Sequence, residues 1–311
     1  MAGSSKKVIY AALVGNALIA ITKFGAAAYT GSSAMLSEGI HSVVDTGNQI
    51  LLLHGINRGK QPPSENFPFG HGKEVYFWSF VVAILIFGLG AGVSIFEGIR
   101  HVLHPEPIEN AAVNYVVLAF AVLFEGIAWF FAFTEFSRAK GRWGYVEAVQ
   151  RGKDPSLFVV LFEDSAAILG LAAAFVGVLL SELTGNYLFD GLASLVIGLI
   201  LGGTATWLAY ETKGLLIGES AARTVVDGIR SVAASYPEIE RVHEVLTMHM
   251  GPNFILVNLS VKFVDGTPAE MIESVIARVD SAIKSEFENV KRVFVEAERG
   301  PRTETEQSRV S

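Results

Sequence analysis

Three ionisable side chains, Glu38, His41 and Asp45, lie close together inside the apolar segment 34–53. On a helix, His41 and Asp45 project from the same face because they are one turn apart, and Glu38 lies near that face. An ionisable group at bilayer depth costs at least ~2.5–3.5 kcal/mol on insertion scales. We therefore expect a bound cation, a partner helix or a water-filled path to offset this cost.

Imidazole and carboxylate groups are ligands that small divalent metals accept from proteins, and zinc favours four ligands in a tetrahedron. The His41/Asp45 pair therefore predicts one half of a metal site. The alternative interpretation of the same residues is a polar stripe that joins neighbouring helices by hydrogen bonds.

A second acidic pair, Glu163 and Asp164, lies in the apolar segment 155–175. Adjacent residues on a helix point about 100° apart, so only one of the two can face a given partner squarely. If the two helices pack together, Asp164 meets His41 and Asp45 and supplies a third ligand. The fourth ligand is open among Glu163, Glu125, Glu38, Asn48 and a water. Glu125 can instead serve as a proton site or a hydrogen-bonding strut.

Composition indicates a membrane protein, because only 18% of the 311 residues are charged and 51% are hydrophobic, whereas soluble domains average about 25% charged residues. The net charge of −7 argues against a nucleic-acid-binding protein. Cysteine is absent, so a metal must use His, Asp, Glu or amide ligands.

Six apolar segments are long enough to cross a hydrocarbon core, which takes about 20 helical residues; we place them near 8–30, 33–56, 74–101, 111–136, 156–182 and 187–210. The first is interpreted as a span and not as a removed signal peptide. The short links near 29–33 and 183–187 predict helical hairpins. Basic residues gather on one side of the predicted membrane, at Lys6, Lys7, Arg58, Lys60, Lys73, Arg138, Lys140, Arg142, Arg151, Lys153 and Lys213, whereas Arg100 lies on the other side. Both termini are therefore expected to face the cytosol.

The chain changes character after the sixth span. Helices are predicted over 222–237 and 267–287, with Thr267 as N-cap and Pro268 at the first helical position. Strands are predicted over 239–252, 253–265 and 290–298. This order predicts a C-terminal cytosolic α/β domain of ferredoxin-like fold over 211–298, after a transmembrane domain over 1–210. The polar tail 299–311 is expected to be disordered.

Three local motifs make a family resemblance specific, namely FPFGHGKEVYFWS (67–79), LFDGLASLVIGLILG (188–202) with Asp190, and KGLLIGESA (213–221). With six predicted spans, His-xxx-Asp in the second, an acidic fifth span and an α/β tail, the chain resembles the cation diffusion facilitator family of zinc transporters over about 8–298. The resemblance implies a homodimer that exports divalent cations, usually zinc, in exchange for protons, and no enzyme activity.

The resemblance places His41 and Asp45 at the two ligand positions of span two, and Asp164 at the later position of span five. The family usually has His or Asp four residues before that aspartate, where this chain has Val160. The segment DPSLFVVLFEDSAA (154–167) is more similar to the branch that includes a mitochondrial zinc exporter. Because Val160 cannot coordinate a metal, the resemblance does not decide the full set of ligands or the metal selectivity.

Secondary metal sites known in the family are only partly matched. His71 matches a loop ligand with Glu65 as the nearby acid, although it can also hydrogen-bond its own tight turn. His243 matches a ligand of the cytosolic domain, with Glu296 and Glu298 near the last ligand positions and Asn258 where a second histidine is often found. Charges on solvated strand edges are the alternative for this set. His249 is a weaker candidate, and we expect three surface histidines, His54, His101 and His104.

The sequence thus predicts a proton-coupled divalent cation exporter in a bacterial inner membrane or an organelle membrane, with lipid and a second copy of the chain as partners. The family resemblance favours zinc as the transported ion, while the ligand chemistry also suits manganese, iron(II) or cobalt. Two other classes remain open, a non-transporting membrane scaffold or metal sensor, and an intramembrane hydrolase that uses a metal-bound water with Glu163 as general base.

Overall fold

The computed structural model describes residues 2–108, 110–141, 143–151 and 153–298. The tail expected to be disordered, 299–311, lies outside these residues. The chain divides into two compact units. Unit one comprises the chain up to Arg58 and Glu74–Lys213, and unit two comprises Gly59–Lys73 and the chain from Gly214 onward.

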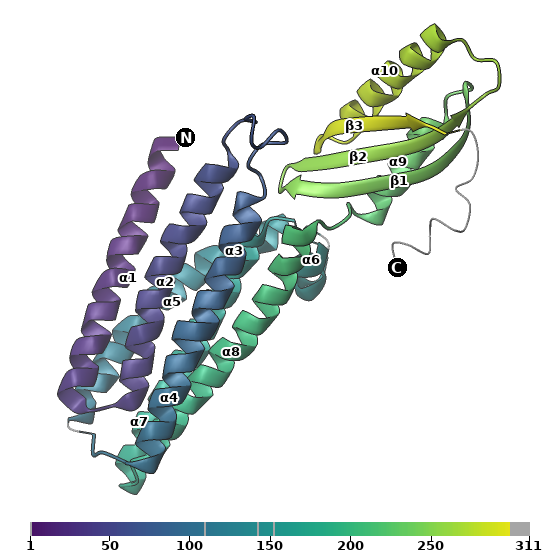
Figure 1. The fold of residues 1–311 in the computed structure, drawn as a ribbon. Coiled ribbons are helices and arrows are strands. Elements are labelled where there is room, and N and C mark those ends of the chain that lie inside the picture. Colours follow the sequence, from purple (N-terminus) through teal and green to yellow (C-terminus); the bar gives the residue numbers. More distant parts are fainter. Residues whose placement is uncertain (1, 109, 142, 152, 299–311) are drawn as a thin grey trace. The chain divides into compact units, whose positions relative to one another are not determined.

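Unit one is a bundle of long helices that lie side by side (Figure 1). Its elements are α1 (Ala2–Thr30), α2 (Ser33–Gly59), α3 (Glu74–Leu85), the π-helix η1 (Ile86–Ala91), α4 (Gly92–Leu103), α5 (Ala111–Ala139), the short α6 (Tyr145–Arg151), α7 (Pro155–Thr184) and α8 (Leu188–Ile217). Helix α5 packs against α1 and α7, and α3 packs against α7.

Within the described residues, four helical stretches are long and apolar enough to cross a membrane, namely Glu74–Leu103, Ala111–Arg138, Phe158–Thr184 and Leu188–Ile217. They correspond to the third to sixth predicted spans. Helices α1 and α2 are not among the four, and α2 carries Glu38, His41, Asp45 and Asn48 along its length. Spans one and two therefore stay predictions.

Local chemistry explains where the helices begin and end. Asp154 is the N-cap of α7, where its carboxylate accepts a hydrogen bond from the Ser156 N–H at 3.1 Å and Pro155 takes the first helical position. Gly31 after α1 and Gly185 after α7 have φ of +72° and +66°, a left-handed conformation that favours glycine. The two predicted hairpin links therefore have turn chemistry that stops the preceding helix.

Unit two has the element order α9 (Arg223–Ala234), β1 (Ile239–Gly251), β2 (Phe254–Phe263), α10 (Ala269–Glu286) and β3 (Val290–Ala297). The sheet order is β1-β2-β3, with β1 antiparallel and β3 parallel to β2. This is the predicted helix and strand order. The predicted cap of α10 is wrong by one residue, because Pro268 is the N-cap and the Thr267 hydroxyl donates back to the Val264 carbonyl.

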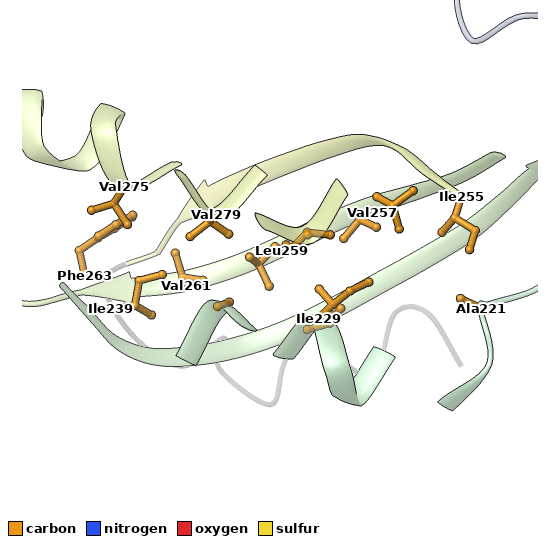
Figure 2. Packing of buried hydrophobic residues seen from close by; sticks show 14 residues of the cluster. Ala221, Ile229, Ile239, Ile255, Val257, Leu259, Val261, Phe263, Val275 and Val279 are labelled. Carbon is orange, nitrogen blue, oxygen red and sulfur yellow. The ribbon is translucent and has the colours of Figure 1, made fainter. Parts of the chain in front are cut away.

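Both helices of unit two contribute to one apolar core on a single face of β2 (Figure 2). Alternate residues of β2 point into this core, as period-two alternation predicts for a strand with one covered face: Ile255, Val257, Leu259, Val261 and Phe263. Helix α9 adds Ile229 and Ala233, and α10 adds Val275, Val279 and Ile283. The opposite face keeps Asn258 exposed.

The segment 59–73 belongs to unit two although it lies between two helices of unit one in sequence. Gly72 packs against the β1–β2 turn so closely that a Cβ there would lie 3.1 Å from Gly251 Cα. The Lys73 ammonium donates to the Leu216 carbonyl at 3.5 Å. Glycine is needed at position 72 because two backbones meet there.

Candidate metal centre

Helix α2 brings His41 and Asp45 together inside unit one, as their spacing predicts. His41 is 1% exposed and Asp45 is 6% exposed. His41 Nδ1 lies 3.2 Å from Asp45 Oδ1. Among the described residues, neither ring nitrogen of His41 nor Asp45 Oδ1 has a hydrogen-bond partner. Buried polar atoms without partners are costly, so this pair has coordination capacity that the protein itself does not fill.

Helix α7 meets this face of α2 through Glu163. The Asn48 amide donates to Glu163 Oε1 at 2.6 Å, and the carboxyl group of Glu163 interacts electrostatically with that of Asp45. Glu163 is 3% exposed. Glu163 therefore makes a polar contact between the second and fifth predicted spans.

Asp164 is 9% exposed and lies within the electrostatic reach of Glu163 and Glu125. The same two carboxylates act on Asp45. No group of three or more His, Asp or Glu side chains is arranged to hold a metal ion in the part of the chain that the structure describes. The His41/Asp45/Asp164 set therefore stays a prediction, with Glu163 and Glu125 as neighbours common to Asp45 and Asp164.

Lys23 of α1 is a functional candidate that the sequence analysis missed. It is fully buried, and its ammonium lies 3.1 Å from Glu38 Oε2, 2.8 Å from Ser42 Oγ and 3.7 Å from Glu125 Oε1. Glu38, considered above as a fourth ligand, is thus engaged by a lysine. A lone lysine within an apolar run was the available signal, because an ionisable residue at bilayer depth is rare without a function.

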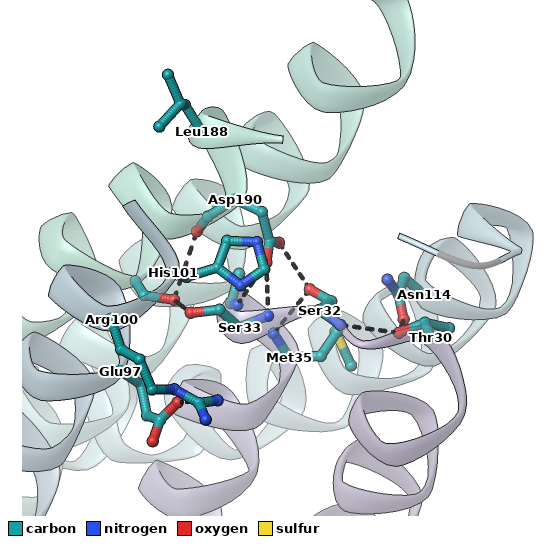
Figure 3. Close-up of polar contacts among 12 residues, drawn as sticks. Thr30, Ser32, Ser33, Met35, Glu97, Arg100, His101, Asn114, Leu188 and Asp190 are labelled. Carbon is teal, nitrogen blue, oxygen red and sulfur yellow. Dashed lines mark hydrogen bonds and ion pairs between the residues drawn. The ribbon is translucent and has the colours of Figure 1, made fainter. Parts of the chain in front are cut away.

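A separate polar cluster forms around Asp190 at the first turn of α8 (Figure 3). Its carboxylate accepts hydrogen bonds from the Ser32 hydroxyl at 2.7 Å and from the backbone N–H groups of Ser33 and Ala34 at 2.5 and 3.3 Å. Asp190 therefore caps the N-terminus of α2 from another helix. His101 lies 3.8 Å from this carboxylate and is 4% exposed.

The expectation that His101 is a surface histidine is wrong, because the last turn of α4 buries it beside Asp190. His54 and His104 are exposed, as expected. The ring of His54 meets the edge of Trp78 at a centroid distance of 5.0 Å. The predicted span ends at residue 101, which put His101 at the edge of a loop, whereas α4 continues to Leu103.

The weaker candidate ligands all lie in unit two. His71 is 9% exposed and its ring lies 4.5 Å from that of Phe67. His243 sits at a register shift of β1, between Val242 and Glu244. Glu296 is exposed on β3, and the Glu298 carboxylate accepts a 2.6 Å hydrogen bond from the Ser260 hydroxyl. His249 is buried on β1. Metal binding by these residues stays a prediction.

The profile of the cation efflux transmembrane domain matches residues 9–217. The proton-coupled zinc antiporter SLC30A9, mitochondrial, of Xenopus laevis is 38% identical over 266 residues, covering 85% of this chain and 47% of that protein. The human protein of the same name is 36% identical over 260 residues, covering 83% and 46%. The chain thus spans about half the length of these two relatives.

The cation-efflux pump FieF of Klebsiella pneumoniae is 27% identical over 284 residues, covering 91% of this chain and 89% of that protein. A solved C-terminal domain of MamM in its nickel form aligns with 26% of this chain and 100% of its own length, at a TM-score of 0.24 and 18% identity. The antiporters and the pump carry names of transporters and not of enzymes. The domain match over residues 9–217 confirms the family resemblance drawn from the sequence, and the chain belongs to the cation efflux family, the cation diffusion facilitators.

Proposed function

We propose that this chain exports a divalent metal cation in exchange for protons, through a site on α2 and α7, and that zinc is the first candidate for this cation. The observation that carries the proposal is the buried His41/Asp45 pair, in which both ring nitrogens of His41 and Asp45 Oδ1 lack hydrogen-bond partners among the described residues. Imidazole nitrogen and carboxylate oxygen are suitable ligands for zinc. Asp164 is proposed as the third ligand, and Glu163 or Glu125 as the fourth.

Proton coupling follows from the chemistry of these ligands. Imidazole and carboxylate must be deprotonated to bind a metal, so metal and protons compete for the same atoms. The electrostatic interaction between the carboxyl groups of Asp45 and Glu163 supports this step, because two neighbouring negative charges attract protons as well as a cation. Opening toward the opposite side, where protons are more abundant, then returns protons to His41 and Asp45 and releases the metal.

Zinc is the first choice of cargo because relatives with 36–38% identity are named as zinc antiporters. A set of oxygen ligands with one imidazole and no sulfur also accepts manganese, iron(II) and cobalt. These three ions are therefore the competing cargoes in the experiment below.

Several features of the working transporter belong to the same proposal. Both termini face the cytosol, as the distribution of basic residues favours. Helices α1 and α2 complete six spans, and 211–298 forms a cytosolic ferredoxin-like domain. Two copies of the chain assemble as a homodimer in a bacterial inner membrane or an organelle membrane.

Metal uptake into proteoliposomes under an imposed proton gradient tests this proposal. We expect zinc uptake by the wild type that collapses when the gradient is dissipated. Asp45→Asn is expected to lower the rate at least ~100-fold, because the amide keeps the shape but loses the charge that binds the cation. Glu106→Gln, in an exposed loop, is the control and should match the wild type. Gradient-independent flux, or equal flux in Asp45→Asn, contradicts the proposal.

A further inference from the structure

Lys23 brings a positive charge into the interior of unit one, next to the proposed cation path. Its side chain is fully buried and comes from α1, a helix that supplies none of the proposed metal ligands. Two of its neighbours, Glu38 and Ser42, lie on α2, and the third, Glu125, lies on α5. The ammonium therefore joins three helices at one point.

The three contacts differ in kind. The ammonium donates hydrogen bonds to Glu38 Oε2 at 3.1 Å and to Ser42 Oγ at 2.8 Å. Glu125 Oε1 lies at 3.7 Å, within ion-pair distance and beyond hydrogen-bond distance. Lys23 is thus held firmly by α2 and loosely by Glu125.

The carboxylate of Glu38 is held in place beside Lys23. Its second oxygen, Oε1, lies directly against Gly170 of α7, where a Cβ would collide with it, and this oxygen has no hydrogen-bond partner among the described residues. The absence of a side chain at Gly170 therefore leaves room for the carboxylate of Glu38, which stays beside the ammonium.

Glu125 lies within ion-pair distance of Lys23 and within electrostatic reach of the proposed metal ligands. This carboxylate acts electrostatically on Asp45 and Asp164 as well as on Lys23. A lysine ammonium is a compact charge on a flexible stem, and opposite charges in a low-dielectric interior attract strongly. A metal bound near Asp45 and the Lys23 ammonium therefore compete for Glu125.

We propose that the Lys23 ammonium competes with the transported metal for the Glu125 carboxylate. Lys23 is thus a positioning residue that sets the affinity for the metal. When the metal is absent, the ammonium attracts Glu125. When the metal binds, Glu125 turns to it and Lys23 stays on Glu38 and Ser42. When the ammonium regains Glu125, the metal is released. This inference rests on the proposed export function.

Zinc affinity of the detergent-solubilised full chain, measured by equilibrium dialysis with radioactive zinc, tests the exchange. Lys23→Gln combined with Glu38→Gln removes the ion pair between α1 and α2 and leaves Glu125 without its neighbouring ammonium. We expect this double variant to bind zinc about tenfold more tightly, because Glu125 loses its competitor. In proteoliposomes its KM and kcat should both fall, because release slows. Lys23→Arg keeps the charge and should remain within about threefold of the wild type.

Ser42→Ala is a milder variant that should change zinc affinity in the opposite direction. It removes one resting partner of Lys23, which then holds Glu125 more strongly, so zinc binding should weaken about threefold. In a Glu125→Gln background, neither change should alter zinc affinity. A residue that only stabilised the bundle would not shift affinity in opposite directions in these two variants.

The outcomes separate this inference from the proposed function. If the wild type binds and transports zinc, and the double variant and Ser42→Ala both bind it with wild-type affinity, the exchange is wrong and export stands. Persistence of both effects without the Glu125 carboxylate also overturns the exchange. If the wild type transports none of the four cations, the proposed function fails and the exchange fails with it.

Discussion

At the scale of residues, the candidate centre is defined by which polar atoms are satisfied and which are not. Asn48 and Glu163 complete a 2.6 Å hydrogen bond between α2 and α7, whereas both ring nitrogens of His41 lack such a partner among the described residues. The first pair contributes to holding the two helices together. The unfilled capacity of His41 and Asp45 is what a cation can use.

We expect Asn48→Ala to destabilise the protein, because it leaves the buried Glu163 oxygen without its amide donor. Loss of one partner of such a buried hydrogen bond costs about 1–3 kcal/mol. Thermal unfolding in detergent should show a lower midpoint. Asn57→Ala, on the exposed part of the same helix, is the matched control. Equal midpoints for the two variants would show that the Asn48 contact contributes nothing to stability.

Local spacing predicted the His41/Asp45 contact, since helical geometry alone puts the two side chains one turn apart. Spacing could not predict that Lys23 pairs with Glu38. That ion pair depends on the rotation of α1 about its own axis, and α1 has no regular polar stripe that would reveal it. The burial of His101 was missed because its partner Asp190 is far away in the sequence.

At the scale of elements, close backbone contacts determine how α4 and α8 cross. A Cβ on Gly198 of α8 would lie 2.5 Å from Ile95 Cγ1 and 3.0 Å from the Ile95 backbone nitrogen. Gly98 and Gly191 make comparable approaches in the same pair of helices. Small residues allow membrane helices to pack at this separation.

Gly198→Ala should therefore destabilise unit one by about 1–3 kcal/mol, the usual cost of overpacking. Gly203→Ala in the same helix meets open space, with nothing within 4 Å of the added Cβ. Thermal unfolding in detergent compares the two directly. We expect a lower midpoint for Gly198→Ala, and an unchanged or higher one for Gly203→Ala, because alanine favours the helix. If Gly203→Ala lowered the midpoint and Gly198→Ala left it unchanged, the close packing of α4 and α8 at Gly198 would be contradicted.

Asp190→Ala should loosen the start of α2, because the Ser33 and Ala34 N–H groups lose their acceptor. Loss of a helix cap costs about 0.5–2 kcal/mol. Asp190→Asn keeps one acceptor oxygen and should fall between the alanine variant and the wild type. Hydrogen exchange at the first turn of α2 reports this order. Equal exchange in all three proteins would show that the cap is not needed.

Element boundaries were largely predictable, because apolar runs, Asp154 and the turn glycines mark them in the sequence. The π-helix η1 and the short α6 were not predicted. A π-turn inside an apolar run leaves its hydrophobicity unchanged, so the sequence pattern there still indicates an uninterrupted helix. The membrane spans of α1 and α2 remain predictions, since the polar residues of α2 reduce its apolar character.

At the scale of the whole molecule, the chain consists of a helical unit that holds the candidate centre and an α/β unit with its own apolar core. The order of helices and strands in unit two followed from period-two alternation and amphipathic helices. That segment 59–73 belongs to unit two was not predictable, because the contact of Gly72 with Gly251 joins positions far apart in the sequence.

The stability of unit two should depend on pH through one ion pair. Arg278 donates to Glu238 Oε1 at 2.7 Å and holds the pKa of Glu238 below its usual value of 4.5. A lowered folded-state pKa contributes stability above the unfolded pKa, and this contribution is lost as pH falls through the folded pKa. The difference in unfolding midpoint between wild type and Arg278→Gln should therefore be constant above about pH 5 and shrink below it. Circular dichroism melts can follow it, and an undiminished difference at about pH 2 would contradict this linkage.

The most direct test of the central claim is to locate zinc in the protein by anomalous scattering from crystals grown with zinc. The account predicts a peak inside unit one, about 2.0–2.2 Å from His41 nitrogen and Asp45 oxygen, with a carboxylate of α7 on the same ion. A protein loaded with zinc only at His71, His243 or other residues of unit two, with no ion at His41 and Asp45, would contradict it.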